Sequence, residues 1–89
     1  MHFGKTFTNK LVSYVDKHFT YNSREMKRES KNALFDFSAF GDNRTLVAVN
    51  RNEYGIFVLI SKDGTTIMRK ILKTYNEVDD FKRMIRCLG

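Results

Sequence analysis

The residue types that most often perform catalysis are few in this chain. His2 and His18 are its two histidines, and His18 falls at the end of a helical pattern, where a cation suits the helix dipole. Cys87 is the single cysteine, and the charges of Arg83 and Arg86 beside it would favour its thiolate form. A structural histidine and a small apolar cysteine explain these residues without catalysis. A thiol-based sensor or small enzyme would depend on Cys87.

Carboxylates and glycines give no catalytic pattern either. Glu77, Asp79 and Asp80 form the one acidic cluster, and a place in the first turn of a helix accounts for them. The chain contains no G-x-S-x-G, H-E-x-x-H or kinase signature, and Gly4 and Gly41 belong to no phosphate-binding pattern. One cysteine excludes an intrachain disulfide and a zinc site of the paired-cysteine type. We therefore expect no enzyme, no metal and no cofactor.

Basic residues are the strongest functional signal. The net charge of +6 favours anionic partners such as nucleic acid, an acidic protein face or a membrane surface, although charge also serves solubility. Residues 21–32 carry +2 and residues 66–89 carry +3, and Tyr21 and Tyr75 lie beside these runs, where they could stack on bases. The predicted binding residues are Arg24, Lys27, Arg28, Lys31, Lys70, Lys73, Lys82, Arg83, Arg86, Tyr21 and Tyr75.

Two helices are expected to flank the chain. Apolar residues from Phe7 to Phe19 recur at helical spacing, which predicts an amphipathic helix over residues 6–18 with Thr6 or Thr8 as its cap. A second helix is predicted from a capping box at Thr74-Tyr75-Asn76-Glu77, in which Asn76 is a competing cap, and its apolar stripe consists of Val78, Phe81, Ile85 and Leu88.

Strands are predicted between these helices. The almost wholly polar residues 21–32 are interpreted as a loop or a solvated helical turn. Four strands are predicted after them, over residues 33–40, 45–50, 55–61 and 66–73, and Asp63-Gly64 favours a type I′ hairpin turn between the last two. The predicted fold class is α+β: one domain of residues 1–89 with a four-stranded antiparallel meander flanked by an N-terminal and a C-terminal helix (α-β-β-β-β-α).

The alternation of side chains assigns two faces to this sheet. If the turns have two or four residues, Ile60 pairs with Ile67, and the face packed beneath the helices holds Phe35, Phe37, Ala39, Leu46, Ala48, Phe57, Leu59, Met68 and Leu72. The opposite face keeps many valines and isoleucines, which is typical of an interface. A homodimer that stacks two sheets is the simplest version, with self-association through Val47, Val49, Val58, Ile60 and Ile67. Alternatively, residues 21–32 cover this face, or the two faces are exchanged.

The location follows from the same inventory. The first residues lack the apolar core of a signal peptide, and the longest apolar run, from Ile56 to Ile60, is too short to cross a bilayer. A lone thiol suggests a reducing compartment. We therefore expect a cytoplasmic protein without a membrane partner.

Short length, the absence of Pro and Trp, and a wealth of Phe, Tyr, Asn and Lys resemble the small accessory proteins of AT-rich bacteriophages. This resemblance implies action in the host cytoplasm against nucleases, toxin–antitoxin systems or other defences, through binding of protein or RNA. The leading hypothesis is a non-catalytic inhibitor or regulator of a nucleic-acid-handling system, which binds nucleic acid, RNA ahead of DNA, or a nuclease or toxin–RNA complex through its basic surface. The alternative is a protein-only inhibitor or adaptor that uses an apolar sheet face.

Overall fold

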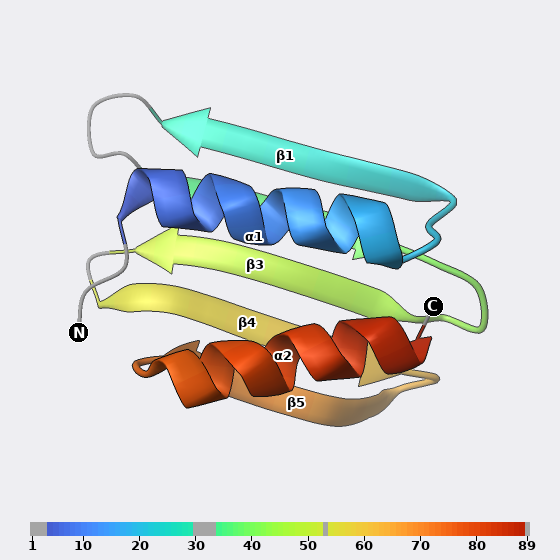
Figure 1. The fold of residues 1–89 in the computed structure, drawn as a ribbon. Coiled ribbons are helices and arrows are strands. Elements are labelled where there is room, and N and C mark those ends of the chain that lie inside the picture. Colours follow the sequence, from blue (N-terminus) through green and yellow to red (C-terminus); the bar gives the residue numbers. More distant parts are fainter. Residues whose placement is uncertain (1–3, 30–33, 53, 89) are drawn as a thin grey trace.

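The described part of the chain consists of one helix, five consecutive strands and a second helix. The computed structural model describes residues 4–29, 34–52 and 54–88. The strands form one antiparallel sheet in the order β1-β2-β3-β4-β5, and Figure 1 shows both helices on the same side of it. The elements are α1 (Lys5–His18), β1 (Ser23–Glu29), β2 (Leu34–Phe40), β3 (Leu46–Asn52), β4 (Gly55–Lys62), β5 (Thr65–Leu72) and α2 (Tyr75–Leu88).

The α+β class is confirmed, but the sheet has five strands and not the predicted four. The additional strand is β1, so the interpretation of residues 21–32 as a loop or helical turn is wrong for residues 23–29. β1 pairs with β2 from Ser23, opposite Phe40, onward. An edge strand tolerates charged residues, and Met26 is the apolar residue of β1, which packs partly against the core. Hydropathy therefore gave no sign of this strand.

The core lies between the helices and the inner side of the sheet. Leu11 and Val15 of α1, Phe19 directly after it, and Val78, Phe81 and Ile85 of α2 are buried, as their helical spacing predicts. The sheet contributes Phe37, Ala39, Val47, Val49, Ile56, Val58, Ile60 and Leu72, which are also buried. Val47, Val49, Val58 and Ile60 are fully buried beneath the helices, so their prediction as exposed self-association residues is wrong.

The reason for the exchanged faces is the length of the β2–β3 connection. Phe40 pairs with Leu46, so five residues separate the two strands and not the expected two or four. Asn43 and Arg44 both adopt positive φ angles, of 56° and 57°, and the Gly41 N–H donates to the Thr45 carbonyl oxygen at 2.9 Å. An odd number of loop residues reverses the side to which the side chains of the following strands point, until the bulge in the β4–β5 hairpin restores the predicted side for β5. β3 and β4 therefore present their valines and isoleucines to the helices.

The β4–β5 hairpin has the predicted turn and an unpredicted bulge. Asp63 and Gly64 have φ angles of 51° and 82°, as a type I′ turn requires. Near the turn Ser61 pairs with Thr66, but Ile60 pairs with Met68, so the predicted Ile60–Ile67 pair is wrong. Ile67 is the additional residue of the bulge, and 40% of its surface is exposed.

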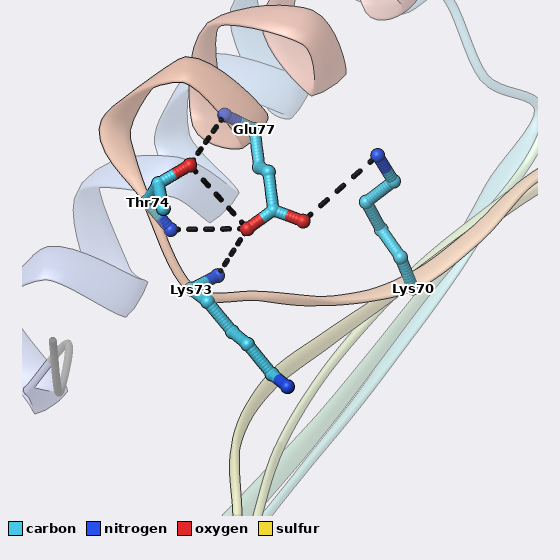
Figure 2. Close-up of polar contacts among 4 residues, drawn as sticks. All are labelled: Lys70, Lys73, Thr74 and Glu77. Atoms are coloured by element: carbon cyan, nitrogen blue, oxygen red, sulfur yellow. Dashed lines mark hydrogen bonds and ion pairs between the residues drawn. The ribbon is translucent and has the colours of Figure 1, made fainter.

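The two helices begin in different ways. α1 follows Gly4, which makes no side-chain cap, and the Thr8 hydroxyl donates to the Gly4 carbonyl oxygen at 2.8 Å, so the predicted threonine cap is wrong. α2 begins with the predicted capping box: the Glu77 N–H donates to Thr74 Oγ1 at 3.2 Å, and the Thr74 N–H donates to Glu77 Oε1 at 3.1 Å (Figure 2). Within the described ranges, neither helix is long and apolar enough to cross a lipid bilayer.

Candidate protein interface on the sheet

The predicted basic residues fall into two groups at opposite borders of the sheet, β1 and β5. Arg24 lies on β1, at one border. A second set, here called the α2 basic group, lies at the β5 border and on the helix above it, and consists of Lys70, Lys73, Lys82, Arg83 and Arg86. Four strand spacings of about 4.8 Å place these borders roughly 19 Å apart. The fold therefore does not bring Arg24 together with the rest.

The other predicted residues of the polar segment are also separated. Lys27 lies on β1 with its side chain on the side of the sheet away from the helices, since Arg24 and Met26 face the helices. Arg28 belongs to β1, but its side chain lies outside the described part, as does Lys31 as a whole.

Arg24 is engaged with its own molecule. Its guanidinium pairs with the Asp16 carboxylate of α1 and lies over the ring of Phe37, 5.5 Å from the ring centroid. Hydrogen bonding to Asp16, with a further contribution from Tyr21, raises the pKa of Arg24 above its ordinary value. Arg24 therefore fastens the end of α1 to the border strand.

The acids of α2 engage much of the α2 basic group. Lys70 Nζ lies 4.0 Å from Glu77 Oε2, and Arg83 Nη1 lies 3.3 Å from Asp80 Oδ1. Lys82 Nζ lies over the Tyr14 ring, 5.2 Å from its centroid. The Lys73 side chain points away from Glu77 in Figure 2. Lys73 and Arg86 are exposed.

The two predicted stacking residues differ in accessibility. Tyr21 is half-buried and packs against the core. Tyr75 is 58% exposed, and its ring meets that of Phe7 edge to face, with centroids 6.4 Å apart. Tyr75 thus presents most of a ring to solvent at the start of α2, whereas Tyr21 does not.

The candidate catalytic residues remain dispersed. His18 stacks against Tyr14 with ring centroids 4.2 Å apart, Cys87 is exposed on the last turn of α2, and His2 lies outside the described residues. Among residues 4–29, 34–52 and 54–88, no group of His, Cys, Asp and Glu is placed to hold a metal ion.

A small depression lies where both helices end. Its volume is about 230 Å³, below the roughly 300–1,000 Å³ of ordinary ligand pockets. Its one carboxylate, Asp42, accepts a hydrogen bond from the Asn22 side chain at 2.8 Å. The depression is lined by Phe19, Thr20, Asp42, Asn43, Thr45, Lys62 and Leu88.

The side of the sheet away from the helices, here called the open face, has an apolar centre. No described element covers it, because both helices pack on the other side (Figure 1). Phe40 is 39% exposed, and the other apolar residues are half-buried by their neighbours alone. The apolar centre consists of Phe40, Leu46, Ala48, Phe57, Leu59 and Ile71.

Strand pairing arranges the open face in rows that run across the sheet. One row consists of Glu25, Ser38, Ala48, Leu59 and Arg69, and the next of Lys27, Asp36, Asn50, Phe57 and Ile71. Among the described side chains of the open face, the charges lie on β1 and β5, at the ends of the rows, and on β2 beside β1. An apolar centre with a polar rim is the usual anatomy of a protein interface.

Sequence reasoning placed the central residues of these rows, Ala48, Leu59 and Phe57, in the core. Both sides of the sheet carry many apolar residues, so the sequence predicts a second apolar surface. It assigns that surface to residues of β3 and β4 that the structure buries beneath the helices.

No known protein family, curated protein or solved structure matches the chain.

Proposed function

We propose that the protein is a non-catalytic interaction protein, an inhibitor or adaptor, whose open face binds protein. The observation that carries the proposal is the apolar centre of a sheet face that neither helix nor any other described element covers. The exposed side of an antiparallel sheet usually alternates to polar residues, and here Phe57, Leu59 and Ile71 occupy those positions instead. Burial of apolar surface yields roughly 25 cal/mol per Å², so covering this face would favour association.

Two further observations agree with this proposal. Phe57 and Leu59 lie on β4, one strand from a border of the sheet, so a partner can reach them directly. The resemblance to phage accessory proteins and the lone thiol of Cys87 fit a binding protein that acts in the host cytoplasm.

The experiment compares Leu59→Glu with Ser13→Glu. Both variants add one negative charge, but Ser13 is exposed on α1, on the other side of the molecule. Tagged wild-type protein and both variants are used to capture partners from the native host, and the captured proteins are quantified by mass spectrometry. We expect Leu59→Glu to lower recovery of a specific partner at least tenfold and Ser13→Glu to leave it unchanged. Equal recovery by all three proteins would contradict the proposal.

Nucleic-acid binding is the second candidate, and the exposure of Lys73, Arg83 and Arg86 on one border favours it. RNA is tested ahead of DNA, across a salt series, because affinity should fall with a slope of roughly −0.7 to −0.9 per phosphate contacted. Lys73→Glu with Arg86→Glu should weaken binding. Lys10→Glu with Lys17→Glu, on exposed positions of α1, is the charge-matched control. Absence of binding at low salt would end this candidate.

A further inference from the structure

We propose that the protein bound at the open face is a second copy of this chain, stacked face to face about a two-fold axis parallel to the strands. The inference rests on the proposed function, because it names the occupant of the same surface. Three properties of the face support it: balanced charge, a self-complementary row and sufficient area.

The charge of the open face differs from that of the whole molecule. Glu25, Lys27, Asp36 and Arg69 are its described ionisable residues, two acids and two bases, whereas the chain as a whole carries +6. The excess positive charge therefore lies elsewhere on the molecule. The open face itself adds no net repulsion when two copies meet through it, which suits a second copy better than a strongly anionic partner.

The two-fold axis makes one row of side chains complementary to itself. It places β1 over β5, β2 over β4 and β3 over β3 of the second copy. Glu25 then lies opposite Arg69 of the second copy, and the large Leu59 lies opposite the small Ser38. Ala48, the smallest apolar side chain of the face, meets itself at the axis. Charges of opposite sign therefore face each other, and a large side chain faces a small one. The two-fold axis repeats both contacts.

The neighbouring row is compatible with the same axis. Lys27 and Asp36 are direct cross-strand neighbours of opposite charge, and they lie over Ile71 and Phe57 of the second copy. The methylene stem of a lysine can cover an apolar side chain while its ammonium group stays in water. Stacked sheets cross at up to about 30°, an offset that the long Arg69 side chain can span.

The area of the face fits a modest dimer. Five strands about 4.8 Å apart, of seven or eight residues at about 3.3 Å per residue, give a face of about 24 by about 23–26 Å, on the order of 600 Å². Standard interfaces bury about 600–1,000 Å² per partner, so the open face lies at the lower end. We therefore expect a reversible dimer with a dissociation constant in the micromolar range.

The first test is sedimentation equilibrium of the purified chain from about 1 to about 500 µM, a range that brackets micromolar affinity. Wild-type protein and Ser13→Glu should dimerise, and Leu59→Glu should remain a monomer. Far-UV circular dichroism and urea unfolding of each variant show that the fold is kept. A wild-type monomer at the highest concentration, or a dimer that Leu59→Glu leaves unchanged, would overturn the inference.

The second test exchanges the charges at the ends of the self-complementary row. Arg69→Glu and Glu25→Arg alone should each raise the dissociation constant about tenfold or more, because each homodimer then pairs like charges at both contacts. An equimolar mixture should restore association, because the mixed dimer regains opposite charges at both contacts. Failure of the mixture to associate would rule out the strand-parallel axis.

The failures of the two proposals are distinguishable. A monomeric wild-type protein whose host partner is lost in Leu59→Glu would overturn the second copy and keep the interaction face. A monomeric protein whose captured partners are the same for wild-type and Leu59→Glu would overturn both.

Discussion

Glu77 is the residue on which the start of α2 depends. Its Oε1 accepts the Lys73 N–H at 2.9 Å and the Thr74 N–H at 3.1 Å, and Lys70 Nζ lies 4.0 Å from its Oε2 (Figure 2). The Lys73 N–H, together with that of Thr74 and the charge of Lys70, lowers the pKa of Glu77 below its usual 4.5. One ionised carboxylate thus satisfies the donors between β5 and α2.

Glu77→Gln is expected to reduce the sensitivity of the fold to acid. Because the folded pKa of Glu77 lies below 4.5, its stabilising contribution is fully present above that pH and is lost as pH falls through the folded value. The variant should therefore have a lower Tm than wild-type at neutral pH, and the difference should shrink below pH 4.5. Thermal unfolding followed by circular dichroism across this range measures it. A constant Tm difference at all pH values would contradict the assignment.

The β2–β3 connection is the element that decides which side of the sheet is buried. Gly41 begins this connection, and a Cβ added there would lie 2.7 Å from Phe19 Cζ and 2.9 Å from the Thr20 carbonyl oxygen. Neither distance is tolerable for a methyl group, and the carbonyl belongs to the backbone, which cannot rotate away. The end of α1 and the β2–β3 connection are therefore packed without room for a side chain.

Gly41→Ala is expected to destabilise the fold by about 1–3 kcal/mol, the usual cost of an overpacked site. Urea unfolding measures the change in the free energy of unfolding. In a Phe19→Leu background, where the aromatic Cζ is gone, part of this loss should be recovered. Equal losses in both backgrounds would show that the Phe19 ring is not what the methyl group meets.

The elements that the sequence predicts well are those with a strong local pattern. Helical spacing predicts the buried stripe of α2, and Asp63-Gly64 predicts the turn between β4 and β5. Two failures share one cause: a single residue changes the strand register without changing hydropathy. A fifth loop residue before Leu46 exchanged the faces of β3 and β4, and the bulge at Ile67 shifted the last pairing. β1 was missed because an edge strand can be almost wholly polar.

At the scale of the molecule, the sheet has one apolar side beneath the helices and another that residues 4–29, 34–52 and 54–88 leave open. Val58 and Leu59 are consecutive on β4, yet Val58 is fully buried beneath the helices and Leu59 lies on the open face. The fold divides the predicted basic binding surface, because its residues lie at two distant borders of the sheet. Loop length controls the first outcome and strand order the second, and neither can be obtained from composition.

Aspartate substitutions at these two positions should have opposite consequences. Val58→Asp buries an unpaired charge and should lower the free energy of unfolding by more than about 4 kcal/mol. For a domain of this size, such a loss leaves most molecules unfolded. Leu59→Asp should cost less than about 1.5 kcal/mol, because the side chain remains in contact with water. Urea unfolding at low micromolar concentration, where association is minor, compares them. Similar losses for both variants would refute the assignment of the faces.

The borders of the sheet limit how far the chain can assemble. β1 carries Arg24, Glu25 and Lys27 along its length, and the bulge at Ile67 distorts β5. Charges and bulges at outer strands both oppose the backbone pairing that would lengthen the sheet. Two copies joined flat side to flat side have no further flat side to offer. At high protein concentration the chain should therefore form such pairs and should not grow into ribbons or fibrils.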